Sequence, residues 1–178
     1  VFRKFPNLRV ALSEGGIGWV PYFLERIDYV YRHHKQWTNQ DFGAKLPSEV
    51  FNEHILTCFI DDAAGMEVRH HLNIDHIHWE CDYPRSDSTW PQAPELAMKY
   101  LDGLPDEDIA RITHRNAMDN FSYDQFAHIP PEHATVGALR AQATDVDTTP
   151  VSHGTGKFQD EGIVTAMTLA ERIAKAHK

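Results

Sequence analysis

Three short apolar segments, each followed by a stretch with helical signals, constrain the fold of this chain most strongly. They cover residues 8–13, 55–60 and 77–82, and each is too short for a typical helix but long enough for a buried strand. The middle segment, ILTCFI, is rich in β-branched and aromatic side chains, which are typical of strands. We therefore predict three strands connected by helices.

Helical signals lie between and after these segments. The expected helices cover residues 19–37, 63–72, 94–101 and 106–121. Pro21 suits the first turn of the first of these helices, and Asp62 is placed to cap the second. Because parallel strands need helical crossovers of this kind, the pattern predicts an α/β fold with a parallel sheet.

The composition changes after Tyr123, where Pro, Thr and Gly become frequent as far as Lys157. We expect this stretch to run over the surface as an extended tail. Residues 160–177 regain an apolar stripe at helical spacing, which predicts an amphipathic terminal helix. The chain is therefore predicted to form one α/β domain over residues 1–124, on which the tail and terminal helix of residues 125–178 pack.

Charge and hydropathy argue against two classes of partner. The net charge is −9 and the basic residues are scattered, whereas binding to nucleic-acid phosphates needs clustered Lys and Arg. No segment approaches the roughly 20 apolar residues of a membrane helix, and we recognise no signal peptide at Val1. Cys58 and Cys81 lie in apolar segments, so we expect reduced, buried thiols in a cytoplasmic protein.

Acidic residues stand where the first and third predicted strands end. Glu14 follows the first strand, and Asp82 ends the third. The carboxyl ends of parallel strands are where α/β enzymes place catalytic groups and metal ligands, which makes both residues candidates. Glu80 shares a strand face with Asp82, at a spacing of about 7 Å. The alternatives are a turn-capping role for Asp82, a hydrogen bond from Glu14 to its glycine-rich turn, and an interior pairing of Glu80 with a neighbour such as His78.

Three blocks of sequence together resemble one enzyme family. They are residues 5–21, which end in SEGGIGWVP, residues 54–62, which end in FIDD, and WECDYP at residues 79–84. In this order and spacing they are similar to the carboxyl-terminal half of amidohydrolase-related metal-dependent hydrolases, the group that includes aminocarboxymuconate-semialdehyde decarboxylase. The resemblance covers about residues 2–124.

The resemblance implies a partial (β/α)8 TIM barrel, because a whole barrel needs about 250 residues. The three predicted βα units would be the last three of the barrel, followed by a carboxyl-terminal extension. The family's metal-binding histidines on the first and fifth strands would then lie before Val1. A divalent metal ion, with zinc as the first candidate, is the implied cofactor, and we expect this chain alone to bind little metal and to be inactive.

The resemblance also implies roles for single residues. Asp82 matches the family's acid at the end of the last strand, which binds the metal or accepts a proton. Glu14 stands where decarboxylase relatives carry a histidine, so a histidine proton shuttle is not expected here. Trp19, Arg85 and Asp87 lie just past strand ends and could line the mouth of the pocket, with Arg85 binding a substrate carboxylate. The alternative for these three is a role in packing or at the surface.

Three functions follow from these observations. The first is a metal-dependent hydrolase acting on a small carboxylated or aromatic substrate, and the second is a non-oxidative decarboxylase of the same family. The third is a catalytically silent domain that forms a homo-oligomer through its open sheet edges. A nucleotide-binding domain also fits the alternation of strands and helices, but EGGIG is neither a dinucleotide fingerprint nor a phosphate-binding loop.

Overall fold

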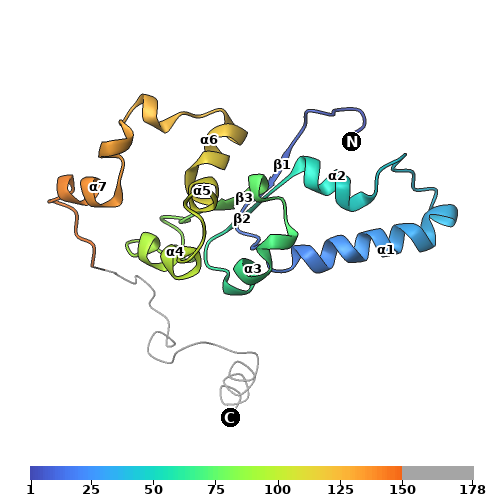
Figure 1. The fold of residues 1–178 in the computed structure, drawn as a ribbon, viewed down its shortest axis with the longest axis horizontal. Coiled ribbons are helices and arrows are strands. Elements are labelled where there is room, and N and C mark those ends of the chain that lie inside the picture. The colour runs from blue at the N-terminus through green and yellow to red at the C-terminus, as the bar shows by residue number, and fades with distance from the viewer. Residues whose placement is uncertain (150–178) are drawn as a thin grey trace, which may run out of the picture. The chain divides into compact units, whose positions relative to one another are not determined.

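A three-stranded parallel sheet lies at the centre of the chain, as the sequence predicts (Figure 1). The computed structural model describes residues 1–149, and residues 1–146 form one compact unit. The strands are β1 (Val10–Leu12), β2 (Ile55–Phe59) and β3 (Ile77–Trp79), in the order β1-β2-β3. Leu12 pairs with Thr57, and Cys58 pairs with His78. The terminal helix predicted for residues 160–177 lies outside the described residues.

Helices connect the strands and continue after the last one. The α-helices are α1 (Val20–Thr38), α2 (Pro47–His54), α3 (Ala63–Val68), α4 (Ala93–Leu101), α5 (Asp106–Ala110), α6 (Asn116–Phe121) and α7 (Val136–Gln142). Short 3-10 turns are η1 (Arg69–His71), η2 (Ile74–His76), η4 (Gln125–Ala127) and η5 (Pro131–His133), and a π-helical turn, η3 (Arg111–Arg115), joins α5 to α6. Among the described residues no helix is both long and apolar enough to cross a bilayer.

Local sequence explains where these helices begin and end. Pro21 occupies the first turn of α1, and Asn39 ends the helix in the left-handed conformation. Asp62 caps α3, but this helix stops at Val68 instead of reaching residue 72, because the chain tightens there into the 3-10 turn η1. The segment from residue 106 to 121, predicted as one helix, is continuously helical, but a π-helical turn in its middle separates α5 from α6.

The hydrophobic core lies between one face of the sheet and the helices that cover it. Phe59 and Ile77 point to this face and are almost fully buried. They meet Ile17 from the β1–α1 turn and side chains of the covering helices, namely Met66, Ala97, Leu101 and Ile112. Because side chains alternate along a strand, the residues between them, such as Cys58 and His78, point to the opposite face.

Buried histidines brace the sheet. The ring Nδ1 of His78 lies 3.0 Å from the carbonyl oxygen of Thr57, and that of His76 lies 3.1 Å from the carbonyl oxygen of Ile55. His54 makes the same contact with the carbonyl oxygen of Leu8 at 2.8 Å. In each case the ring N–H donates to a neighbouring segment, so these side chains hold backbone rather than a ligand.

The segment after Tyr123 differs from the extended tail that the composition predicted. It contains two 3-10 turns and the helix α7, whose cap is Thr135, with Oγ1 accepting a hydrogen bond from the Ala138 N–H at 3.2 Å. Arg140 of α7 forms an ion pair with Glu95 of α4 and lowers the pKa of that carboxyl to about 2. The cysteines also differ from expectation, because Cys58 and Cys81 are half-buried thiols rather than fully buried ones.

Candidate functional site

The carboxyl ends of β1 and β3 bring together the acids that the sequence singled out. The chain leaves β1 at Leu12, so that Glu14 lies at its end, and it leaves β3 at Trp79, directly before Glu80. The Glu80 carboxylate accepts a hydrogen bond from the Glu14 N–H at 2.6 Å. It also accepts one from the Ser13 hydroxyl at 2.9 Å. Glu80 is therefore paired with a neighbour, as one of the two interpretations has it, but the neighbour is the end of β1 and not His78.

Arg85 lies between the two predicted catalytic residues. Its Nη1 is 3.2 Å from Glu14 Oε1, and its Nε is 3.4 Å from Asp82 Oδ2. The Arg85 side chain is largely exposed, whereas that of Asp82 is only 9% exposed. Asp82 Oδ2 accepts no hydrogen bond, so Arg85 is the only compensation for this carboxylate oxygen among the described residues. The structure thus places Glu14, Asp82 and Arg85 in one cluster.

Both acids of this cluster occupy an uncommon backbone conformation. Glu14 has φ = 61° and Asp82 has φ = 55°, in the left-handed region. A residue other than glycine pays of order 1 kcal/mol or more to remain there, and such residues gather at functional sites. The left-handed turn also explains why β3 stops at Trp79 and does not reach Asp82 as predicted, since it takes the chain out of the sheet.

A pocket of about 340 Å³ opens beside this cluster. Its lining comes from the turns after all three strands: Glu14, Gly15, Gly16, Ile60, Asp61, Asp62, Asp87 and Thr89. Asp87, expected at the mouth of the pocket, is among these residues, whereas Arg85, expected there too, and Asp82 are not. The sequence predicts only a helix cap for Asp62, because its local context gives no sign that it faces the end of β1. The pocket wall carries four carboxylates, which favours cationic or strongly polar groups within it.

Trp19 takes a different position from the one predicted. Its indole N–H donates to the carbonyl oxygens of Gly15 at 2.9 Å and Gly16 at 3.1 Å, and its ring packs edge-on against Phe23. The side chain therefore holds the glycine turn from outside and is absent from the lining of the acidic pocket. Nothing in the structure brings Trp19 together with Asp82 and Arg85.

Cys58 is a chemically inert neighbour of the cluster. Burial, followed by the negative charge of Glu80, raises the pKa of the Cys58 thiol well above its ordinary value. The thiol thus stays protonated at neutral pH and is a poor nucleophile and metal ligand. Within residues 1–149, no three side chains of His, Cys, Asp or Glu stand close enough to hold a metal ion together.

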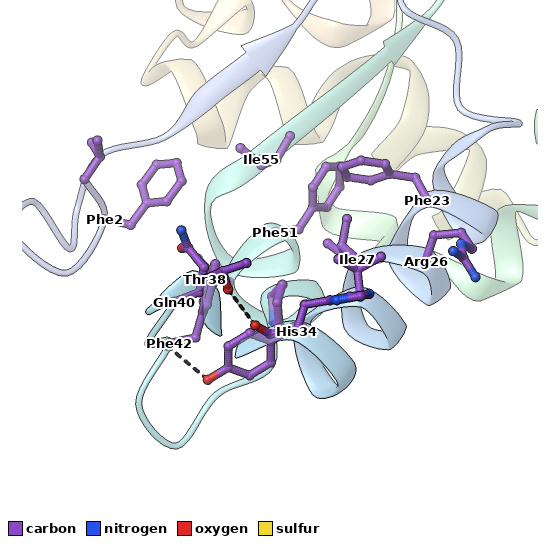
Figure 2. Close-up of a pocket in the computed structure, with 15 residues that line it drawn as sticks. Phe2, Phe23, Arg26, Ile27, His34, Thr38, Gln40, Phe42, Phe51 and Ile55 are labelled. Carbon is purple, nitrogen blue, oxygen red and sulfur yellow. Dashed lines mark hydrogen bonds between the residues drawn. The ribbon is translucent and has the colours of Figure 1, made fainter. Parts of the chain in front are cut away.

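A larger, apolar pocket of about 740 Å³ lies at the other end of the sheet (Figure 2). Figure 2 shows Phe23 and Ile27 of α1 facing Phe51 of α2, with Phe2 across from them. Ile55, which also lines it, is the first residue of β2, so this pocket opens toward the amino end of that strand. It is separate from the carboxylate cluster.

The model of the amidohydrolase family matches residues 1–121. The chain belongs to the amidohydrolase family. This confirms the resemblance carried by the three sequence blocks. A search of curated proteins finds no match.

Solved structures with TM-scores above 0.5 share the fold of this chain. The 5-carboxyvanillate decarboxylase LigW from Sphingomonas paucimobilis is 22% identical with a TM-score of 0.57, over 69% of this chain and 36% of that one. An amidohydrolase from Mycobacterium avium subsp. paratuberculosis K-10 is 20% identical with a TM-score of 0.55, over 66% of this chain and 29% of that one. A dihydroxybenzoic acid decarboxylase from Polaromonas sp. JS666, solved with manganese and 2-nitroresorcinol, is 22% identical with a TM-score of 0.47, over 68% and 36%. The chain thus spans about a third of the length of these enzymes.

Proposed function

We propose that this amidohydrolase chain supplies the last three βα units of a (β/α)8 barrel and one side of a metal-dependent active site. The observation that carries the proposal is the cluster of Glu14, Asp82 and Arg85 at the carboxyl ends of the strands. In barrels of this kind the active site lies at that face, and conserved groups there come from the ends of several strands. The substrate would be small and carboxylated or aromatic.

Each residue of the cluster has a role that its surroundings support. Asp82 is nearly buried, and its Oδ2 makes no hydrogen bond and faces only Arg85 at 3.4 Å, which suits a ligand of a hard cation or a proton acceptor once Arg85 moves away. Arg85 is exposed enough to turn toward a substrate and has the planar fork that binds carboxylates. Glu14 is a second proton acceptor or a group that orients substrate. Its backbone is held in place because its N–H donates a hydrogen bond to the Glu80 carboxylate.

The proposed cofactor is a divalent cation, with zinc as the first candidate. Such an ion polarises a carbonyl or carboxylate oxygen and activates water. Because no three ligating side chains converge within residues 1–149, the proposal takes Asp82 as one ligand and assigns the others to the part of the barrel that this chain does not span. The chain's own contribution is to present the Asp82 carboxylate, neutralise it with Arg85 and hold Glu14 nearby.

Two reactions are open to this arrangement. Hydrolysis is the first, because a carboxylate at position 14 can take a proton from water. Non-oxidative decarboxylation is the second, and it is supported by the shared fold with 5-carboxyvanillate decarboxylase, whose name describes an aromatic carboxylate substrate. Release of carbon dioxide from aromatic carboxylates, measured beside the hydrolysis of carboxylated amides and esters, separates the two.

The test uses the longest natural reading frame that contains this sequence. We expect purified protein to hold a stoichiometric divalent metal, and Asp82→Asn to lower kcat/KM by about 100-fold or more and to weaken metal binding. The control is Asp102→Asn, which changes an exposed carboxylate after α4. Wild-type activity in Asp82→Asn, with a matched circular dichroism spectrum, would contradict the role of Asp82.

The alternative is a silent domain that self-associates. It is supported by β1, which pairs with β2 on one side and with no strand of residues 1–149 on the other. An open strand edge of this kind pairs readily with a second copy. Sedimentation of this chain at several concentrations, combined with metal analysis, decides the matter: a metal-free, inactive homo-oligomer supports the silent domain, whereas tight stoichiometric metal argues against it.

A further inference from the structure

Asp62 connects the turns after two strands through its carboxylate. Its Oδ2 accepts hydrogen bonds from the Ile17 N–H at 2.6 Å and the Gly18 N–H at 2.9 Å, both in the turn that joins β1 to α1. Its Oδ1 accepts from the Gly65 N–H at 2.8 Å, which caps α3. Only the hydrogen bond from Gly65 is a helix cap. The hydrogen bonds from Ile17 and Gly18 come from a segment more than 40 residues earlier in the chain.

The segments around Asp62 are shaped to let its carboxylate approach. Gly16 has φ = +65°, and a Cβ built on it would lie 3.0 Å from Asp62 Oδ2. A Cβ on Gly18 would lie 3.1 Å from the Gly65 N atom and 3.3 Å from Asp62 Oδ1. Larger residues at these positions would crowd the carboxylate, so the glycines and Asp62 form one close-packed unit.

This unit is continuous with the candidate site. Glu14, Gly15, Gly16 and Asp62 line the same acidic pocket. Ile17, which donates to Asp62, is fully buried in the core, so the turn is fixed at its far end while Glu14 begins it. The Glu14 N–H donates to Glu80, and the Glu14 carboxylate pairs with Arg85. Glu14 itself makes no hydrogen bond with Asp62 within residues 1–149. Any shift of the turn therefore changes where Glu14 stands relative to Asp82.

We infer that Asp62 is a positioning residue of this enzyme site: its carboxylate fixes the β1–α1 turn and so sets the place of Glu14 opposite Arg85 and Asp82. The inference rests on the proposed function for its catalytic consequence, but the positioning itself is a property of the chain. The neighbouring Asp61 serves a different purpose, because its carboxylate accepts a hydrogen bond from the Tyr100 hydroxyl.

The discriminating variant is Asp62→Ser in the full chain. A serine hydroxyl still caps α3 through the Gly65 N–H, but it cannot also reach Ile17 and Gly18, so the variant keeps the cap and removes the contact to the turn. Asp61→Ser is the matched control. Asp62→Asn is the second variant, since it preserves the side-chain size should the serine variant fold poorly.

Amide hydrogen exchange provides the first measurement. We expect Asp62→Ser to accelerate exchange about 10-fold or more at Ile17 and Gly18, which lose their acceptor, and also at Glu14, whose N–H is bonded to Glu80. Asp61→Ser should leave all three amides unchanged. Faster exchange at Ile17 and Gly18 with unchanged protection at Glu14 would overturn the inference, because Asp62 would then act only locally.

Kinetics of the longest reading frame provide the second measurement. We expect Asp62→Ser to lower kcat about 10-fold or more with little change in KM, because Glu14 is misplaced while substrate contacts through Arg85 remain. Equal kcat in the variant and the wild type would overturn the inference. An inactive wild type would reject the proposed function instead, and the exchange at Glu14 would still decide whether Asp62 positions the turn.

Discussion

Gly65→Ala is expected to destabilise the chain strongly, because no space exists for its methyl group. A Cβ built on Gly65 would lie well inside 3.0 Å of both Asp62 Oδ2 and Ile17 Cγ1, a separation that real Cβ atoms essentially never show. Ile17 is fully buried, so relief requires either a shift of the core or a movement of the Asp62 carboxylate away from the Ile17 and Gly18 N–H groups. Overpacking costs about 1–3 kcal/mol, and a lost hydrogen bond to a charged group adds about 1.5–3 kcal/mol.

We therefore expect the free energy of unfolding to fall by about 3 kcal/mol or more, which corresponds to a decrease in Tm of roughly 6–12 °C for a unit of this size. Urea denaturation followed by tryptophan fluorescence measures it. The matched control is Gly137→Ala in α7, where a Cβ would meet nothing within 4 Å and alanine is the better helix former. A loss below 1 kcal/mol in Gly65→Ala would refute the close packing of Asp62, Ile17 and Gly65.

Two further predictions concern titratable groups. Burial, and then the charge of Arg9, lowers the pKa of His76 below its ordinary 6.5, so unfolding takes up a proton and stability should fall as pH drops below about 6.5. The midpoint of urea unfolding, measured at pH 7.5 and at pH 5.5, tests this prediction. His76→Gln should reduce the difference between the two midpoints. An equal difference in the wild type and the variant would contradict the prediction. The Cys58 thiol, with its pKa raised by burial and by Glu80, should react slowly with iodoacetamide at pH 8.5 in a Cys81→Ser background. Glu80→Gln should accelerate the reaction, and an unchanged rate would count against the contact with Glu80.

The parallel direction of the strands followed from local sequence, whereas the strand ends did not. The short apolar runs and the helices between them leave little choice but a parallel sheet. Polar and apolar residues, however, alternate from His78 to Asp82 as in a strand, and only the left-handed backbone at Asp82 shows that the chain has left the sheet. A conformation of this kind depends on the tertiary contacts that stabilise it, so periodicity could not predict it.

Contacts over long sequence separations were equally hidden. Glu80 finds its partners at Ser13 and the Glu14 N–H, 66 or more residues away, and local spacing pointed instead to His78. Asp62 was predicted correctly as a cap, because that contact is local. The helix α7 is a different case: Thr135 and the apolar residues after it form a local helix signal, which the surrounding prolines and glycines outweighed.

The separation of β1 and β3 explains why one arginine is central to the candidate site. β2 lies between these strands, so the backbones that carry Glu14 and Asp82 stand about two strand spacings, roughly 10 Å, apart. Two ionised carboxylates have no donor for each other, and a buried one needs a positive charge nearby. The Arg85 side chain is long enough to contact both the Glu14 and the Asp82 carboxylates. It comes three residues after Asp82, so its side chain points back toward that residue. Under the proposed function, a cation that binds Asp82 would release Arg85, which would then bind the carboxylate of the substrate. Charge balance at the strand ends and substrate binding therefore depend on the same side chain.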